Sequence, residues 1–230
     1  MEPASPTQAN SDAEIVVTAY SQRYLDASAE LIDVSEGGAK VTNDPVDRGG
    51  TTKFGISLRF LASEGAFDED GDGKADFDLD MDGDIDGADV RALTRGDAVF
   101  LYHRCFWKRL DCESHPRPLG EMLFDQGVNG GLVAAGKLLQ RALNTSLMEA
   151  RQRMGSNSAP ALLKVDGVLG DLSRAAEIWV LKYPAFGMPA IVANYRAAAR
   201  ERYRAIVARW PSQRKYLNGW LARADRLGRS

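Results

Sequence analysis

The sequence has few of the residues that build disulfide frameworks, metal-binding histidine clusters or membrane spans. It contains two cysteines, Cys105 and Cys112, which cannot form a disulfide framework. Cys105 lies in an apolar stretch with helical spacing, which favours a reduced thiol in the core. The two histidines, His103 and His115, lack a spacing typical of metal binding. Because no run of about 18 apolar residues occurs, we expect no membrane span.

The N-terminal segment lacks the basic start and apolar core of a conventional signal peptide, so we expect the protein to be made without one. Residues 1–10 are rich in Pro, Ser and Gln and are expected to be disordered. No internal repeat of solenoid length is visible. These features predict a globular protein.

The charge is distributed unevenly over the 230 residues, whose formal net charge is −3. Residues 68–89 hold eleven acids and one lysine, a net charge of −10, so the remainder carries +7. A basic body favours an anionic polymer as partner. Bacterial cell wall fits this description, whereas the interleaved basic and aromatic residues typical of nucleic-acid binding are missing. We therefore expect no nucleic-acid partner.

Helical periodicity dominates the chain and predicts a mainly α protein. Ser11 with Glu14 and Thr94 with Asp97 have the spacing of capping boxes, and the first helix should end near Ser35. Turns and short strands are predicted over 39–55, and a polar loop over 148–160. Trp179, Trp210 and Trp220 have helical spacing from other apolar residues, which favours the core. The predicted helices span 11–35, 56–65, 94–110, 118–131, 131–144, 171–183, 187–208 and 212–227.

One glutamate, Glu36, falls where the first predicted helix ends. Glycoside hydrolysis needs a carboxyl group that keeps its proton near neutral pH and reaches the glycosidic oxygen. The negative end of a helix dipole raises the pKa of such a group. Gly37 and Gly38 remove side-chain bulk beside it, so a polymer could approach closely. The alternative is a solvated glutamate followed by an ordinary glycine cap.

The hairpin segment after Glu36 supplies candidates for the second catalytic group. Asp44, Asp47 and Thr52 would approach Glu36 if the segment folds back on the helix end. A carboxylate or a held water acting opposite the acid gives an inverting reaction. Asp before Pro and Asp near Gly-Gly are also ordinary turn residues, and Thr52 could simply pack in a strand. The residues alone leave these alternatives open.

Four segments, in order along the chain, resemble the glycoside hydrolase family 108 muramidases. The first three are SEGGAKVTNDPVDRGGTTKFGIS (35–57), LTRGDAVFLYHRCFW (93–107) and FDQGVNGGLVAAGKLLQRALN (124–144). The fourth, LKVDGVLGDLSRAA (163–176), is similar to the peptidoglycan-binding region that follows in that family. The resemblance runs from about Leu25 to the end of the chain, apart from the acidic insert.

The resemblance implies an α+β lysozyme-like fold, a helical bundle with a small β-hairpin region next to the catalytic glutamate. It implies hydrolysis of the β-1,4 bond between N-acetylmuramic acid and N-acetylglucosamine, with Glu36 as the catalytic acid. Thr52 matches the family's hairpin threonine, and Asp44 and Asp47 match its two aspartates. Ala39 stands where the family has tyrosine, and Phe54 replaces the tyrosine of its Tyr-Gly-Ile run.

The resemblance also implies that the expected partner is the glycan strands of peptidoglycan. We expect a monomer of bacterial or phage origin that acts in the periplasm or at the bacterial cell wall. Besides the two glycines after the glutamate, the expected substrate-binding residues are Phe54, Phe124, Asp125, Gln126 and Asn129. The expected organisation is a catalytic lobe over 11–117 and a helical peptidoglycan-binding lobe over 118–230, packed together. Two alternatives remain: a lytic transglycosylase, and a non-catalytic calcium-dependent wall-binding module.

The acidic insert fits the twelve-residue calcium loop of EF-hand proteins. Carboxylates fall at loop positions 1, 3, 5, 7, 9 and 12, with Gly83 at position 6 for the sharp turn. The acid at position 12 is Asp rather than Glu, as in dockerin-type loops. The expected ligands are Asp78, Asp80, Asp82, Asp84, Asp86 and Asp89. We therefore expect structural or regulatory Ca2+, not a catalytic cofactor.

A second, incomplete copy of the calcium loop begins at Asp68. Its candidate ligands are Asp68, Asp70, Asp72 and Asp76, but Leu79 occupies position 12. The two loops overlap at residues 78 and 79, so two separate helix-loop-helix units cannot both form. The first loop is either an incomplete site or shares carboxylates with the second.

Overall fold

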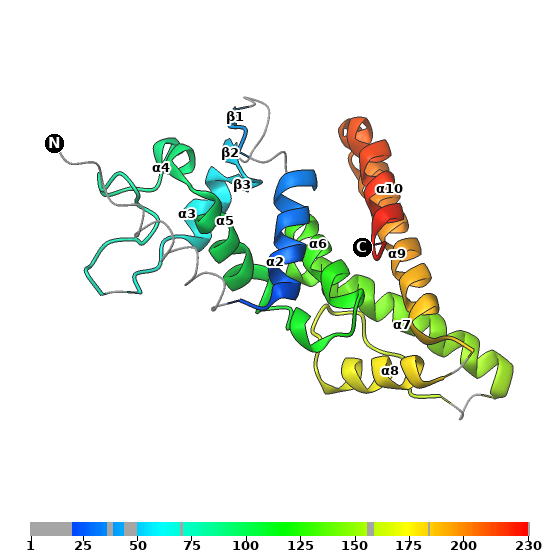
Figure 1. Ribbon diagram of the computed structural model, residues 1–230. Coiled ribbons are helices and arrows are strands. Elements are labelled where there is room, and N and C mark those ends of the chain that lie inside the picture. Colours follow the sequence, from blue (N-terminus) through cyan, green and yellow to red (C-terminus); the bar gives the residue numbers. More distant parts are fainter. Residues whose placement is uncertain are drawn as a thin grey trace. The chain divides into compact units, whose positions relative to one another are not determined.

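The computed structural model describes residues 20–35, 39–43, 50–69, 71–155, 159–183 and 185–229. The chain divides into two compact units, unit 1 (Met1–Lys108) and unit 2 (Arg109–Ser230). Helices dominate both, and the strands of the described residues form one small antiparallel sheet in unit 1 (Figure 1). The predicted fold class, mainly α of the α+β lysozyme-like kind, is confirmed. Within the described residues, no helix has the length and apolar character of a membrane span.

Among the described residues, unit 1 combines six helical segments with the sheet. Ser21 accepts a hydrogen bond from the Tyr24 amide and begins α2, and Ser57 does the same for Phe60 at the start of α3. The Thr94–Asp97 capping box predicted from the sequence begins α5. The elements are α2 (Gln22–Glu30), a π-helix (Leu31–Ser35), β1 (Thr42–Asn43), β2 (Thr51–Lys53), β3 (Ile56–Ser57), α3 (Leu58–Glu64), α4 (Gly87–Ala92), α5 (Arg95–Tyr102) and a π-helix (His103–Trp107).

Two buried tyrosines hold unit 1 together across long sequence distances. Tyr24 of α2 donates its hydroxyl to the Val99 carbonyl of α5. Tyr102 donates to the Phe54 carbonyl in the β2–β3 turn at 2.8 Å. Both side chains are nearly inaccessible to solvent, so each bond forms in the core and fixes a helix against its neighbour.

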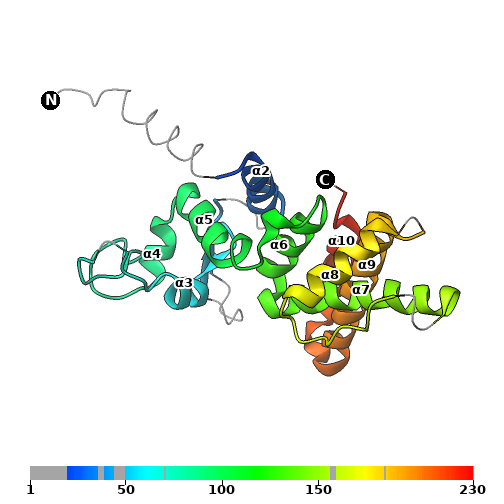
Figure 2. The same cartoon turned by 90° about the horizontal axis from the view of Figure 1, so that it is seen from below.

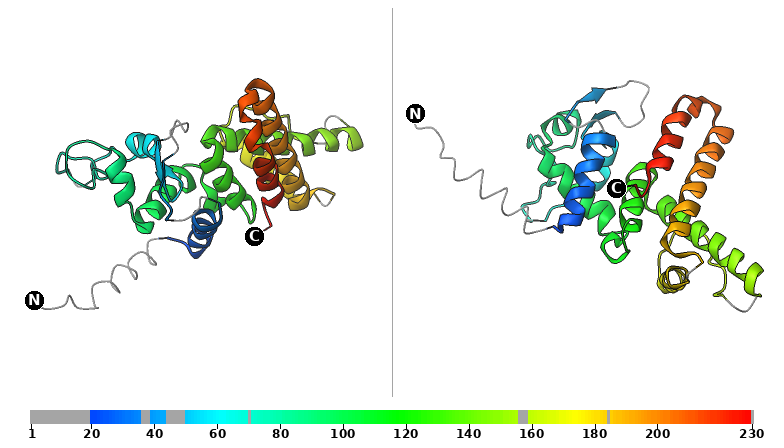
Figure 3. Two further views of the ribbon diagram at one scale, coloured as in Figure 1. Left: turned by 90° about the horizontal axis from the view of Figure 1, so that it is seen from above. Right: turned by 45° about the vertical axis from the view of Figure 1, so that its right-hand side comes forward.

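Unit 2 is helical throughout its described secondary structure. α9 packs along both α7 and α10, and Figure 3 shows α9 and α10 side by side in orange and red. Apolar side chains of α7 such as Leu138, Leu139 and Leu143 are fully buried, as its periodicity predicts. The elements are a 3-10 helix (Cys112–Ser114), α6 (Leu119–Gly130), α7 (Leu132–Met154), α8 (Asp171–Lys182), α9 (Gly187–Arg209), a 3-10 helix (Pro211–Tyr216) and α10 (Leu217–Arg226).

The structure corrects three local predictions. The helix that begins at Gln22 has Ser21 as an extended N-cap, so an uninterrupted helix from Ser11 is wrong; the Ser11–Glu14 pair itself lies outside the described residues. The loop predicted from residue 148 is wrong as far as Met154, because Ala150 is buried and extends α7. Trp210 is 52% exposed rather than in the core, whereas Trp179 and Trp220 are half-buried.

The boundary between the units falls after Lys108, earlier than the predicted boundary after Arg117. The intervening segment is tied to α8 of unit 2. Asp111 pairs with Arg174, and His115 Nδ1 lies 2.7 Å from Glu177 Oε2 in a buried pair. These bonds explain why the segment belongs to unit 2. The roles predicted for the two lobes stay predictions.

Candidate active site and acidic insert

Only part of the predicted catalytic segment lies within the described residues. Glu36, Gly37, Gly38, Asp44 and Asp47 lie outside the described residues. The helical segment before them continues as a π-helix to Ser35, which agrees with the end predicted from the sequence. Glu36 therefore follows the last residue of that helical segment in the sequence.

Asp33 and Arg95 join the end of this helical segment to the start of α5. Arg95 donates to both carboxylate oxygens, with an Nη2 to Oδ2 distance of 2.9 Å. This hydrogen bond lowers the pKa of Asp33 below its ordinary value. The ion pair is about half-exposed, so it orients the two elements more than it stabilises them.

Thr52 occupies the central strand of the three-stranded sheet. It pairs with Thr42 of β1 and Ser57 of β3, and residues directly opposite one another in a sheet share a face. The three hydroxyl-bearing residues therefore form a row on one face. Thr52 is half-buried, and its Oγ1 donates a long hydrogen bond of 3.4 Å to the Gly50 carbonyl. Its hydroxyl oxygen keeps acceptor capacity for a water or a sugar hydroxyl.

Phe54 lies in the two-residue turn between β2 and β3. Phe54 and Gly55 have φ values of +53° and +78°, as in a tight hairpin turn. A positive φ is unusual for a phenylalanine, and the hydrogen bond from Tyr102 to its carbonyl holds this conformation. The ring is 7% exposed. The structure thus packs this predicted substrate-binding ring in the core of unit 1, and substrate contact remains a prediction.

The predicted substrate-binding residues of unit 2 belong to a ring of hydrogen bonds between α6, α9 and α10. Asp125 accepts from Arg223 Nε at 3.0 Å and from Gln126 Nε2 at 2.9 Å. Tyr203 donates to Gln126 at 3.0 Å and accepts from Asn129 at 2.9 Å. No local sequence pattern indicates Arg223 or Tyr203, because each lies far along the chain from its partners.

Phe124, the remaining predicted substrate-binding residue of unit 2, is 1% exposed, as is Gln126. Asp125 and Arg223 retain 22% and 13% side-chain exposure, respectively. The ring therefore acts as a packing contact between three helices. A contact with substrate by any of these residues stays a prediction.

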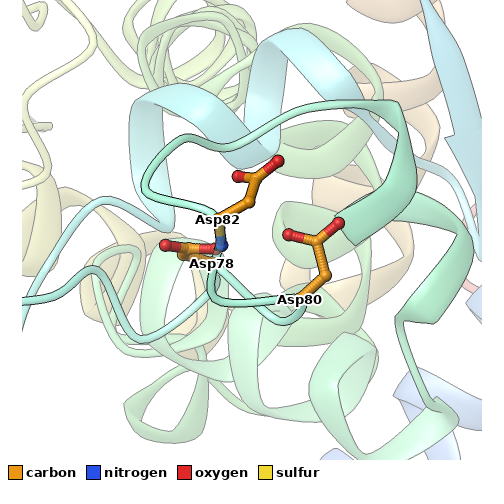
Figure 4. A group of neighbouring side chains, drawn as sticks. All are labelled: Asp78, Asp80 and Asp82. Atoms are coloured by element: carbon orange, nitrogen blue, oxygen red, sulfur yellow. Dashed lines mark hydrogen bonds between the residues drawn. The ribbon is translucent and has the colours of Figure 1, made fainter.

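The second loop of the insert gathers its carboxylates around one turn. Figure 4 shows Asp78, Asp80 and Asp82 on this turn, and one carboxylate oxygen from each lies within 4.8 Å of the others. Asp78 accepts bonds from the amides of loop positions 5 and 6, at 3.1 and 2.9 Å. A carboxylate held in this way faces the loop centre rather than the solvent.

Asp89, the residue at loop position 12, is a buried carboxylate at the start of α4. Its exposure is 0%, and it accepts backbone bonds from Leu79 at 2.6 Å, from Asp80 at 3.3 Å and from Asp86 at 2.7 Å. A second acidic group joins Asp89 with Asp84 and Asp86. These bonds close the loop, because residues from both of its ends meet on one side chain.

The first loop repeats part of this bonding pattern. Asp68 accepts from the amide at loop position 6 at 2.9 Å, and Asp72 accepts from position 7 at 2.8 Å, as Asp78 and Asp82 do in the second loop. Asp76 accepts from the Glu69 amide, with contacts of 3.2 and 3.3 Å. Asp70 lies outside the described residues.

Two exposed carboxylates of the second loop, Asp80 and Asp84, have raised pKa values. The pKa of Asp84 is raised first by the charge of Asp82, and the pKa of Asp80 first by partial loss of hydration and then by Asp82. A cavity of about 440 Å³ opens between the two loops and α3, lined partly by Asp78, Asp82 and Asp84. The arrangement offers oxygen ligands of the kind that a hard divalent cation prefers.

The insert is connected to the sheet through α4, which packs on β2. Lys53 of β2 donates to the Arg91 carbonyl of α4 at 2.6 Å. A Cβ atom on Gly87 would lie 3.3 Å from Thr51 Oγ1, so the backbone of α4 lies close to the Thr51 side chain. Figure 2 shows the insert loops at the side of unit 1 opposite α2. This route from the acidic loop to the strand of Thr52 was not visible in the sequence.

The fold and these two groups of residues define a mainly α, lysozyme-like protein with an acidic loop beside its sheet. The glycosyl hydrolase 108 family model matches residues 29–131, somewhat less than half of the chain, which supports a glycoside hydrolase. This match includes the Glu36 segment, the sheet and α6. No sequence among curated proteins matches the chain.

Among solved structures, the chain is similar to the one titled "Structure of Brucella abortus SagA". The TM-score is 0.61 at 21% identity, and the alignment covers 89% of this chain and 91% of SagA. At this identity the likeness shows a shared fold over nearly the whole of both chains.

Proposed function

We propose that the protein is a peptidoglycan hydrolase that cleaves the β-1,4 bond between N-acetylmuramic acid and N-acetylglucosamine. The observation that carries the proposal is the glycosyl hydrolase 108 match over residues 29–131, which contains Glu36. In this proposal Glu36 protonates the leaving oxygen. The helical segment ending at Ser35 supports this role, because the negative end of a helix raises the pKa of a nearby carboxyl.

In the same proposal a water on the opposite face of the sugar ring completes an inverting reaction. Asp44, Asp47 and Thr52 are its candidate holders. The free acceptor capacity of the half-buried Thr52 hydroxyl, in the central strand, supports a role in positioning that water. The site of action is the periplasm or the cell wall.

Clearing of purified cell walls by Glu36→Gln tests the acid. We expect a rate lower by roughly 100-fold or more, because glutamine cannot supply the proton. Glu30→Gln is the matched control, since Glu30 is an exposed glutamate on α2. Equal rates for Glu36→Gln and the unsubstituted protein would remove Glu36 as the acid and favour a non-catalytic wall-binding module.

The products separate hydrolysis from the alternative transglycosylase reaction. Hydrolysis leaves a reducing N-acetylmuramic acid end, whereas a lytic transglycosylase leaves an anhydro end of lower mass. Mass spectrometry of a wall digest distinguishes the two. The anomeric configuration of the fresh product, measured by NMR, then tests inversion.

We also propose that the acidic insert binds Ca2+ and stabilises unit 1. The carboxylates grouped at Asp78, Asp80 and Asp82 support a first ion, and the similar bonding of the Asp68 loop supports a second, weaker one. The packing of α4 on β2 would transmit ordering of the loop to the strand of Thr52.

Calorimetric titration with Ca2+ and thermal unfolding with excess Ca2+ or excess chelator test this proposal. Ligand at roughly 100 times its Kd adds about 2.7 kcal/mol to the free energy of unfolding. Asp80→Asn should reduce both the affinity and the shift in Tm. Asp26→Asn on α2 removes the same charge outside the insert and should leave both unchanged. No calcium-dependent shift in the unsubstituted protein would contradict the proposal.

A further inference from the structure

A long groove runs between α7 and α9 of unit 2. Two cavities of about 390 and 380 Å³ adjoin there and share Arg141, Ala198 and Glu201. One end reaches Met148, and the other reaches Trp210. Alanines of α9 form part of its lining. Its elongated form suits a chain-like ligand better than a compact one.

The groove carries an excess of positive charge. Arg141, Arg202 and Arg209 line it together with the acid Glu201, a net charge of +2. Arg141 and Arg209 are exposed. A guanidinium binds a carboxylate through two parallel hydrogen bonds, so spaced arginines favour a ligand with spaced carboxylates.

Trp210 gives one end of the groove an apolar platform. The ring is 52% exposed, and the Arg209 guanidinium lies 5.0 Å from its centroid. Its backbone amide donates to the Ile206 carbonyl at 2.8 Å, and Pro211 follows it, so the position of Trp210 at the end of α9 is well defined. A pyranose ring presents a face of C–H bonds that covers such a surface and removes it from water.

We propose that this arginine groove, defined by Arg141, Arg202, Arg209 and Trp210, is a non-catalytic binding site for a peptidoglycan strand. The inference rests on the proposed function, which supplies the polymer. Peptidoglycan combines sugar faces for Trp210 with peptide carboxylates for the arginines. Glu201, in the shared middle of the groove, accepts hydrogen bonds from hydroxyl and amide groups but repels a continuous phosphate backbone. The charge pattern therefore favours peptidoglycan over nucleic acid.

Co-sedimentation with purified, insoluble peptidoglycan tests the groove. The full chain carries Glu36→Gln throughout, so the strand is not consumed. We expect Trp210→Ala to weaken binding roughly tenfold by loss of the apolar platform. We expect Arg209→Gln to weaken it by a similar, roughly tenfold factor through loss of a charged hydrogen bond. Thermal unfolding of each variant verifies that the fold is retained.

Arg204→Gln is the matched control. Arg204 is an exposed arginine on α9, but its helical position faces away from the Arg202 side of the helix. Unchanged binding by Arg204→Gln together with weaker binding by Trp210→Ala and Arg209→Gln supports the site. Equal retention of all three variants overturns it.

The outcomes for the groove and for the hydrolase are distinguishable. If the unsubstituted protein clears walls and the groove variants bind them normally, the groove proposal alone is overturned. If binding depends on the groove residues but the unsubstituted protein does not clear walls, the proposed hydrolysis alone is overturned. Retention of a single-stranded RNA or DNA oligonucleotide that depends on Arg209, without retention of peptidoglycan, also overturns the groove proposal.

Discussion

The acidic insert of unit 1 and the arginine groove of unit 2 carry opposite charges on different kinds of backbone. The carboxylates of the insert lie on a loop, and three of them approach within 4.8 Å of one another. The arginines of the groove lie on α7 and α9, between its shared middle and the end at Trp210. The loop brings its carboxylates close to one point, an arrangement that suits the binding of an ion. The two helices place their arginines along a line, an arrangement that suits the binding of a polymer.

The largest expected effect is at Asp89, where the charge of the insert is most buried. Asp89→Ala leaves three backbone amides without their acceptor and should lower the free energy of unfolding by roughly 3 kcal/mol. Urea unfolding in excess chelator measures this without a contribution from calcium. The exposed Asp84→Ala is the control and should change the free energy of unfolding far less than Asp89→Ala does. Similar losses in both variants would mean that Asp89 does not close the loop.

Next in size is Arg223, whose charge is fixed by partners, unlike the exposed arginines of the groove. Arg223→Met removes the contact with the half-buried Asp125 and should lower the free energy of unfolding by about 2 kcal/mol, with wall binding unchanged. Trp210→Ala should do the reverse. Urea unfolding and co-sedimentation measure the two readouts. Loss of binding at unchanged stability in Arg223→Met would instead support the substrate contacts predicted from the sequence for Asp125 and Asn129.

Sequence reasoning succeeded where the determining interactions are local. The capping pair of Thr94 with Asp97 and the end of α3 at Gly65 each lie within a few residues along the chain. Such signals depend on backbone groups of the same segment, so a single stretch contains the whole pattern.

Sequence reasoning failed where distant residues meet. Arg223 and Asp125 are 98 positions apart in the sequence, and no local pattern predicts that they form a pair. Trp210 has helical spacing, but its exposure depends on where α9 ends and the chain turns at Pro211. Residues 148–154 are polar enough for a loop, yet the burial of Ala150 extends the helix. Tertiary packing decided each of these cases.

A smaller effect is expected at Lys53, the bond between the insert and the sheet. Lys53→Met removes its hydrogen bond to the Arg91 carbonyl and should lower the free energy of unfolding by about 1 kcal/mol. Calcium affinity should stay unchanged, while the dependence of wall clearing on calcium should weaken. The exposed Lys40→Met is the control. Calcium dependence that is unchanged in Lys53→Met would show that α4 does not connect the ion to the sheet through this bond.

The smallest expected effect is the pH dependence of the calcium-free protein. Asp80 and Asp84 have pKa values raised above the ordinary 3.8, so the folded state binds their protons more tightly than the unfolded state. The cost of the two charges arises first from partial loss of hydration at Asp80 and first from repulsion by Asp82 at Asp84. This cost should therefore be relieved as the pH falls from neutral through the raised pKa values towards 3.8. The effect of Asp33 on stability has the opposite sign, because the hydrogen bond from Arg95 lowers its pKa. Its contribution to the free energy of unfolding is present above pH 3.8 and is lost as the pH falls through the lowered pKa.

Thermal unfolding between pH 7 and pH 4 in excess chelator measures this dependence. Other carboxylates titrate in the same range, so the informative quantity is the difference between the unsubstituted protein and the double variant Asp80→Asn, Asp84→Asn. The double variant should have a higher Tm at neutral pH, and its advantage should shrink as the pH falls. Parallel Tm profiles would contradict repulsion at the loop. Because the arginines of the groove keep their charge throughout this range, Arg209→Gln should leave the profile unchanged.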